Sequence, residues 1–260
     1  MLAGAYIISF TGMILLPIIA WIVFTRKFKL SWKLVLAGGL TFIASQIPHI
    51  PLVFKLDPFM QKNSLIVNAV ILGLLAGIFE ETARYILYKF IIKNSRTWKD
   101  GILVGLGHGG TEALIIGVAA MAAFVTMTGY RSVDMSTVPG ISADQVELAT
   151  QQVAAYWSAP TYIALMGFVE RIFAMCLHVS LSVMVLYAIT SKKTVWFWLA
   201  LLWHALVDAV AVYAIPNLGI LATEGLVAIF ALISIWFAIN LRSKFNDNVP
   251  DTLQPETLPA

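Results

Sequence analysis

Residues 64–92 read SLIVNAVILGLLAGIFEETARYILYKFII, and this stretch decides how the rest of the chain is interpreted. It is apolar over more than the ~20 residues that a helix needs to cross the hydrocarbon core of a bilayer. It nevertheless carries Glu80, Glu81 and Arg84. Ionisable residues inside a membrane-spanning segment are costly and usually mark a functional site. The stretch therefore predicts a transmembrane helix that contributes to a polar site within the membrane.

The composition of the whole chain supports a membrane protein. Of its 260 residues, 60% are hydrophobic and 12% are charged, whereas a soluble domain carries about 25% charged residues. Seven apolar stretches have the length of a transmembrane helix: 3–24, 34–54, 64–92, 101–128, 160–190, 195–215 and 219–241. We therefore expect an all-α, polytopic integral membrane protein with about seven transmembrane helices that enclose a polar site.

The domain organisation follows from where the polar segments lie. Residues 1–245 would form a single transmembrane domain, in which the core that carries the site lies at about 64–215. Residues 246–260 are polar and contain proline, which is typical of a disordered tail. No positive charge precedes the first apolar run, so we expect no cleavable signal peptide. In the long connector 130–159, Ser142 and Gln145 resemble a capping box that would begin an interfacial helix, either a lid or a simple surface helix.

Basic residues in the connectors predict the orientation, because cytoplasmic loops are enriched in Lys and Arg. One side would carry twelve of them: Arg26, Lys27, Lys29, Lys33, Lys89, Lys93, Arg96, Lys99, Lys192, Lys193, Arg242 and Lys244. The other side would carry three: Lys55, Lys62 and Arg131. The sequence thus predicts a cell-membrane protein with its N-terminus outside and its C-terminal tail in the cytoplasm.

Charge and cysteine content exclude other classes. The net charge of +3 and the lack of a basic stretch with interleaved aromatic residues argue against nucleic acid as a partner. The single cysteine, Cys176, excludes a disulfide within the chain. The lipid bilayer is the partner that the composition does predict.

Ten ionisable residues lie inside the predicted spans, at similar depths on four of them. They are Glu80, Glu81, Arg84, His108, Glu112, Glu170, Arg171, His178, His204 and Asp208. The five carboxylates and two guanidiniums would cost roughly 20 kcal/mol if they were unpaired in lipid. Helix geometry places the set roughly 10–20 Å from the cytoplasmic boundary. We therefore expect one shared cavity that opens toward the cytoplasm.

The spacing within the third and fourth spans suggests separate tasks. Glu80 and Glu81 are adjacent and point about 100° apart, so one can activate water while the other pairs with Arg84. His108 and Glu112 share a helix face four residues apart, which favours catalysis or ligation by His108. Two sets of small residues would let neighbouring helices approach closely: Gly101, Gly105, Gly109, Ala113 and Gly117, and Gly73 and Gly77.

The fifth and sixth spans add further candidates. His178 lies on a polar stripe with Glu170 and is a candidate site residue, whereas Glu170 and Arg171 are equally candidates for structural support. His204 and Asp208 share a face, so the aspartate can orient the imidazole and the histidine can donate to a developing oxyanion. If a metal is bound, its ligands would be His108, His178 and His204; zinc is then the candidate, although the HExxH pattern is absent.

Four motifs together resemble the CAAX endopeptidase superfamily. They are FEETARY at 79–85, HGGTEA at 108–113, ERIFAMCLHVSLS at 170–182 and the pair His204 and Asp208. The pattern is most similar to the YhfC branch and covers about residues 64–215. The resemblance implies an intramembrane protease of the bacterial type, acting on a membrane-associated peptide or protein near the cytoplasmic half of the bilayer.

The resemblance also implies roles for individual residues. Glu80 and His108 would activate water, Glu81 would complete the catalytic set beside Arg84, and His204 would receive the carbonyl oxygen. Asp208 stands where the CAAX enzymes have asparagine, and an ionised aspartate cannot donate a hydrogen bond. YhfC-type proteins are commonly labelled metalloproteases, whereas CAAX enzymes are read as glutamate-dependent and metal-free, so no cofactor is firmly expected and zinc stays open.

Two functions of other classes remain as alternatives. Buried glutamate and histidine chains also relay protons in transporters, although the sequence lacks an inverted repeat. A non-enzymatic immunity protein that binds a membrane peptide would use the same cavity.

Overall fold

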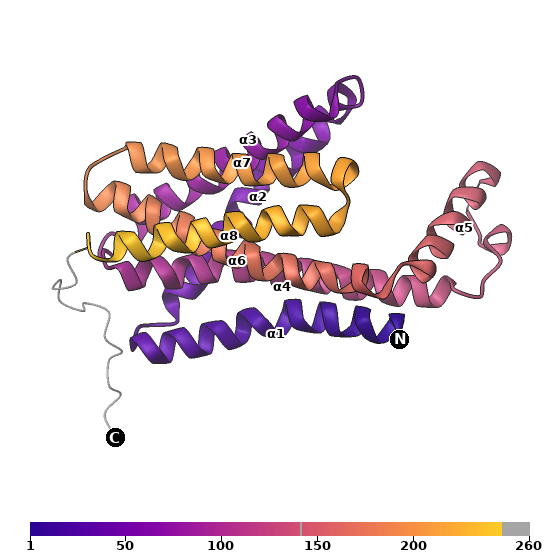
Figure 1. Cartoon of the computed structure of the whole chain (residues 1–260), viewed down its shortest axis with the longest axis horizontal. Coiled ribbons are helices and arrows are strands. Elements are labelled where there is room, and N and C mark those ends of the chain that lie inside the picture. The colour runs from indigo at the N-terminus through magenta and orange to yellow at the C-terminus, as the bar shows by residue number, and fades with distance from the viewer. Residues whose placement is uncertain (141, 246–260) are drawn as a thin grey trace.

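The computed structural model describes residues 1–140 and 142–245, and the statements below concern those residues. They form an all-helical bundle (Figure 1). Its α-helices are α1 (Leu2–Phe28), α2 (Lys33–Met60), α3 (Leu65–Ile86), α4 (Trp98–Tyr130), α5 (Ala143–Ser158), α6 (Thr161–Thr190), α7 (Val195–Leu218) and α8 (Ile220–Arg242). A short π-helix, η1 (Leu87–Ile91), continues α3, and a 3₁₀ turn, η2 (Met135–Thr137), precedes α5.

Seven of the described helices are long and apolar enough to cross a membrane: α1, α2, α3 with η1, α4, α6, α7 and α8. This confirms the expected polytopic all-α class, and each predicted span is present with its ends moved by a few residues. The predicted tail 246–260 lies outside the described residues. The expectation of a single domain over 1–245 stays a prediction.

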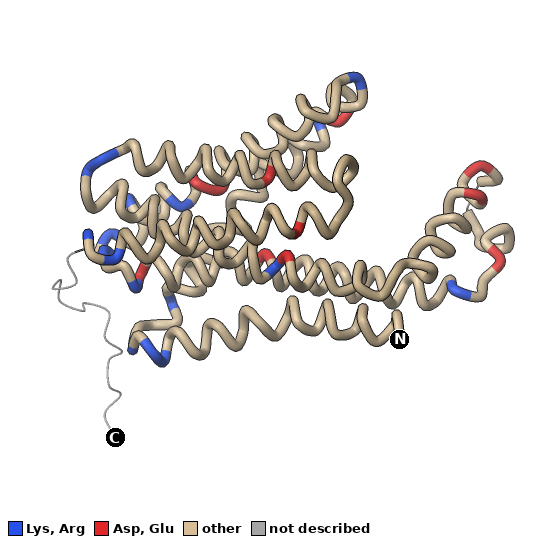
Figure 2. The backbone as a smooth tube through the Cα atoms, viewed as in Figure 1, with Lys and Arg blue, Asp and Glu red and all other residues tan. Residues whose placement is uncertain are grey.

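The helices alternate in direction, so their connectors gather at two ends of the bundle. One end holds the connectors at 29–32, 92–97 and 191–194 together with Arg242, and we call it the basic end. The other holds 61–64, 131–140 and the turn at Gly219, and we call it the Gly219 end. Figure 2 shows most Lys and Arg at the basic end, whereas Asp and Glu lie mainly in the middle of the bundle and in the region of α5.

Helix α6 is the central helix of the bundle. It packs against α1, α4, α7 and α8 and also touches α3. Every residue from Leu177 to Leu186 is buried, so this part of α6 contacts protein on all sides. The other close pairs are α3 with α7, α2 with α4 and α1 with α4.

Small residues bring these helices into backbone contact. A Cβ added at Gly73 of α3 would lie 2.2 Å from the carbonyl oxygen of Ala205 on α7. On α4, a Cβ at Gly105 would lie 2.6 Å from Cα of Val179, and one at Gly109 would lie 2.9 Å from Cβ of His178. The predicted role of the small residues as helix contacts is therefore confirmed. Because α3 meets α7 and α4 meets α6 so closely, polar side chains on all four helices can reach one another.

The connector 130–159 contains the expected helix. The capping box of Ser142 and Gln145 is present, and α5 has no buried residue. Its C-terminal aromatics pack on other helices: the Tyr156 ring stacks on Tyr6 of α1 at 4.3 Å between centroids, and Trp157 Nε1 donates to the carbonyl oxygen of Met127 at 2.8 Å. In Figure 1, α5 projects beyond the bundle. This position favours a surface helix over a lid.

Candidate functional site

The structure joins all ten predicted ionisable residues into one network, here called the polar cluster. Its members are Glu80, Glu81 and Arg84 on α3, His108 and Glu112 on α4, Glu170, Arg171 and His178 on α6, and His204 and Asp208 on α7. Each contacts another member at 4.0 Å or less. A continuous network of this kind is how buried charges avoid the cost of standing alone in a low-dielectric interior.

Glu80 is the residue on which α2, α4 and α7 converge. Its Oε2 lies 2.9 Å from His108 Nε2 and 4.0 Å from His204 Nε2. Its Oε1 accepts a hydrogen bond from Gln46 Nε2 of α2 at 3.1 Å. Arg84 NH2 lies 3.7 Å from Oε2. The carboxylate is thus held at both oxygens and is surrounded by proton donors.

Glu81 points to a different place, as the angle between adjacent helical residues requires. Its Oε1 accepts from Arg84 NH1 and lies 2.7 Å from His204 Nδ1. A carboxylate at this position fixes the tautomer of the ring, because Nδ1 must carry the proton to donate. The second nitrogen of His204, Nε2, then faces Glu80 and also Asp208 Oδ2, 3.5 Å away. Glu81 therefore orients His204 toward the cavity.

His178 links the two halves of the cluster. Its Nδ1 lies 2.7 Å from Arg84 NH2, and its Nε2 lies 2.5 Å from Glu112 Oε2. Since a guanidinium can only donate, Nδ1 accepts and Nε2 carries the proton toward Glu112. Glu112 Oε1 also accepts from Arg171 NH1 at 2.7 Å, and Arg171 bonds Glu170 in turn. Glu170 and Arg171 thus support Glu112, which supports His178.

Seven members of the polar cluster line a cavity of about 80 Å³, whose walls come from α3, α4, α6, α7 and α8. Such a volume holds a few water molecules, since one water needs roughly 10–15 Å³ by this measure. Glu80, His178, His204 and Asp208 face it. The apolar part of its wall includes Ala211 of α7 and Val227 of α8. A reacting group of a ligand would meet carboxylate and imidazole side chains here, with apolar walls around them.

The cavity extends toward one of the two ends of the bundle. Ala211 and Val227 lie about 10 Å from the helix ends that meet at Gly219, at 1.5 Å per residue. Toward the basic end, the hydroxyl groups of Tyr88 and Ser182 bond at 2.6 Å and both side chains are buried. The cavity therefore extends toward the Gly219 end, away from the basic connectors. Depth along the helices predicted the layer but not its open side.

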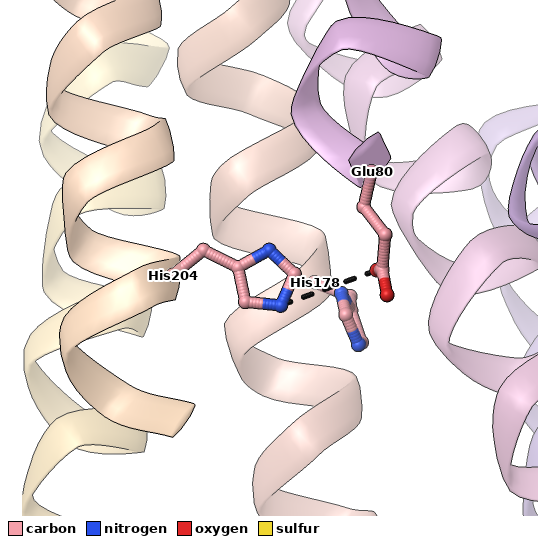
Figure 3. Close-up of side chains that lie close together, drawn as sticks. All are labelled: Glu80, His178 and His204. Carbon is pink, nitrogen blue, oxygen red and sulfur yellow. Dashed lines mark ion pairs between the residues drawn. The ribbon is translucent and has the colours of Figure 1, made fainter. Parts of the chain in front are cut away.

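Three residues bring potential metal ligands together. One donor atom from each of Glu80, His178 and His204 lies within 4.8 Å of the others, and Figure 3 shows the three side chains converging from α3, α6 and α7. Two histidines and a glutamate form a ligand set that zinc enzymes use. The predicted third histidine, His108, is not part of this group and contacts it through Glu80.

The chemistry of these donors fits a dication. The polar cluster has five carboxylates and two guanidiniums, a surplus of three negative charges if all are ionised. His204 also has the arrangement common for zinc ligands, in which the nitrogen opposite the metal donates to a carboxylate. His178 fits less directly, because both of its nitrogens are already hydrogen-bonded, to Arg84 and Glu112.

Sequence reasoning missed some residues of the site. Gln46 holds Oε1 of Glu80 and also bonds His49 Nδ1 at 3.1 Å. Tyr88 closes one end of the cluster through Ser182. Gln46 is a single uncharged amide in an apolar span, and a tyrosine such as Tyr88 near a helix end is typical of a membrane-interface anchor. Neither was therefore predicted as a site residue. Their roles depend on which helices pack together, which spacing along one helix does not reveal.

Fold and site together define a multi-pass membrane protein with a buried carboxylate and histidine centre. Residues 12–231 match the family described as YhfC intramembrane metalloprotease. The chain is 31% identical over 244 residues to the uncharacterized membrane protein YhfC of Bacillus subtilis (strain 168), covering 89% of this chain and 93% of that protein. No solved structure matches. The chain therefore belongs to the YhfC family, as the sequence motifs suggested.

Proposed function

We propose that this protein is an endopeptidase that hydrolyses a peptide bond of a membrane-associated protein or peptide at the polar cluster. One observation carries the proposal: the Glu80 carboxylate is buried, is held at both oxygens by Gln46 and His108, and lines a cavity large enough for water together with His178 and His204. The family description, which names a protease, supports the same reaction class.

Without a bound metal, the residues suggest a division of tasks. Water adds to the carbonyl carbon, one water proton passes to Glu80, and Glu80 returns it to the leaving amine as the carbon–nitrogen bond breaks. His108 donates to Oε2 and keeps the carboxylate in place. His204, oriented by Glu81, presents Nε2 to the cavity, where its protonated form would donate to the developing oxyanion. Arg84 holds Glu81 and is a positioning residue.

A zinc-class ion is the cofactor that this donor set favours. Glu80, His178 and His204 would hold it, with Glu81 supporting His204. When bound, such an ion acts as a Lewis acid that makes water more acidic and polarises a carbonyl group. His178 would exchange its bond to Arg84 or to Glu112 for the ion. Glu112 and Asp208 would remain as the nearest carboxylates available for proton transfer.

A metal-free mechanism is the second candidate, and a specific contact favours it. His108 Nε2 already lies 2.9 Å from Glu80, and His178 is fully occupied by Arg84 and Glu112. In that case Glu80 and His108 activate water without a metal. The two candidates share Glu80 and His204 and differ in their response to a chelator.

The test compares new peptide termini in proteoliposomes that contain the wild type or Glu80→Gln. A membrane-protein extract and a peptide library are added, and cleavage products are identified by mass spectrometry. We expect Glu80→Gln to lower cleavage by roughly 10²–10⁴-fold, because general-base catalysis contributes that much. Glu147→Gln is the matched control, since Glu147 is exposed on α5. It should cleave as the wild type does.

The outcomes separate the candidates. Loss of cleavage on chelation, with recovery on adding zinc, supports the metalloprotease. Cleavage that persists in chelator, with Glu80→Gln inactive, supports the metal-free mechanism. A folded Glu80→Gln protein with the termini and rates of the wild type would contradict both.

A further inference from the structure

The basic end of the polar cluster is closed. Tyr88 and Ser182 are fully buried and bonded to each other, one turn beyond Arg84 and His178. Beyond them, the apolar side chains of α6 up to Leu186 are buried against η1 and α4. Within residues 1–140 and 142–245, a packed apolar layer therefore separates the polar cluster from the basic end.

Exposure rises in the opposite direction. The side chain of Glu80 is 7% exposed, that of Glu112 is 19%, that of Asp208 is 37% and that of Glu170 is 43%. The more exposed residues lie on α6 and α7, nearer α8. The gradient runs from the interior toward the gap between these helices.

The exposed carboxylates indicate that this gap contains water and not lipid. A carboxylate in contact with hydrocarbon loses its hydration without gaining a partner. Asp208 has one contact in the cluster, at 3.5 Å, and is more than a third exposed, so water must solvate the rest of it. An opening lined by such groups is hydrated.

Helix α8 adds an independent sign of a hydrated passage. Glu224 lies one turn from the start of α8, on the same face as Val227 and Ala231, which line the cavity. Glu224 is only 8% exposed, and its Oε2 has no hydrogen-bond partner among the described residues. Because buried polar atoms normally have a hydrogen-bond partner, we expect this carboxylate oxygen to bond to a ligand or a water molecule.

We propose that a hydrated passage between α6, α7 and α8 leads from the polar cluster to the Gly219 end and admits the substrate. Glu170, Asp208, Ala211 and Glu224 lie along it. Where the basic end is cytoplasmic, the substrate is a peptide segment presented from outside the cytoplasm. The passage stands on the geometry alone; its use by substrate rests on the proposed protease function.

The test measures from which side a single cysteine reacts with a membrane-impermeant thiol reagent. The full chain carries Cys176→Ser, and one cysteine is placed at Ala211. Thr194→Cys marks the basic end and Thr137→Cys marks the Gly219 end, since both residues are exposed. Ser180→Cys is the buried control on α6, on the basic side of His178. Denatured samples confirm that every cysteine is present and reactive.

The expected result is that Ala211→Cys reacts from the side that labels Thr137→Cys. Its rate should exceed that of Ser180→Cys by roughly tenfold or more, because the thiolate forms readily only where water reaches it. Reaction from the side of Thr194→Cys, or a rate equal to that of Ser180→Cys, would overturn the proposal.

A second measurement tests passage of substrate. In the proteolysis assay, a bulky thiol reagent on Ala211→Cys should abolish cleavage, whereas the same reagent on Thr194→Cys should leave it unchanged. Sided labelling without a block of cleavage would retain the passage and reject its use by substrate. If no variant or wild type cleaves any peptide, the labelling result still decides whether the passage exists.

Discussion

Glu81 is fully buried, and Arg84 and His204 both bond to the same oxygen of its carboxylate. Its other oxygen, Oε2, has no partner among the described residues. The carboxylate therefore depends on Arg84 for charge compensation. Glu80, one residue earlier, has its hydrogen-bond partners on other helices, Gln46 on α2 and His108 on α4. The two adjacent glutamates thus have different hydrogen-bond partners, because helical geometry sends them in different directions.

Replacement of Arg84 by glutamine should destabilise the fold strongly. It leaves the Glu81 carboxylate buried without its cation, which typically costs about 3–5 kcal/mol. The double variant Glu81→Gln, Arg84→Gln removes both charges and should lose less stability than the sum of the single variants. Unfolding in detergent, followed by circular dichroism against denaturant, measures all three. Additive losses would show that the two residues do not stabilise each other.

The sequence allowed this separation of Glu80 and Glu81 to be predicted, because it depends only on helix geometry. It did not allow the partners to be predicted. Gln46 and His204 reach the two glutamates from α2 and α7, and nothing in their local sequence says which carboxylate each one meets. Residue-level contacts between helices were therefore beyond the sequence.

At the level of elements, glycines set how closely the helices that carry the site approach. Gly73 and Gly77 of α3 lie against the backbone of Ala205 and Leu201 on α7. That contact places Glu81 beside His204. Small residues at regular spacing predicted a close helix contact but left the partner helix open.

Gly73→Ala should separate α3 from α7. The added Cβ would lie 2.2 Å from a backbone oxygen, which cannot move alone, so overpacking should cost about 1–3 kcal/mol. Gly225→Ala of α8 is the matched control, because a Cβ there meets nothing within 4 Å. It should be neutral or stabilising by about 0.5–1 kcal/mol, since alanine favours a helix. Thermal unfolding of the two variants in detergent provides the comparison; equal stability would contradict the close contact as the cause.

For the whole molecule, the asymmetry of basic residues predicts the orientation. The basic end should face the cytoplasm and the Gly219 end the outside. In intact cells, an impermeant thiol reagent should label Thr137→Cys in a Cys176→Ser background and leave Thr194→Cys unlabelled until the membrane is permeabilised. The reverse pattern would invert the topology.

Span number and the ionisable layer could be predicted because both follow from hydropathy and helix rise. The open side of the cavity could not. Depth along a helix places Asp208 and His204 in one layer, but exposure depends on how α6, α7 and α8 pack around them. If the basic end is cytoplasmic, as the count of Lys and Arg predicts, the cavity extends away from the side that we expected.

The central position of α6, with residues 177–186 buried on every side, has a consequence for biogenesis. A helix that carries Glu170, Arg171 and His178 is costly to place in lipid by itself. It is also the helix against which most of the others pack. Arg171 and His178 bond to side chains on α4 and α3, which are synthesised before α6. Helix α8, which is synthesised later, also packs against α6. We therefore expect α6 to enter the membrane together with α3 and α4, and not as an independent step.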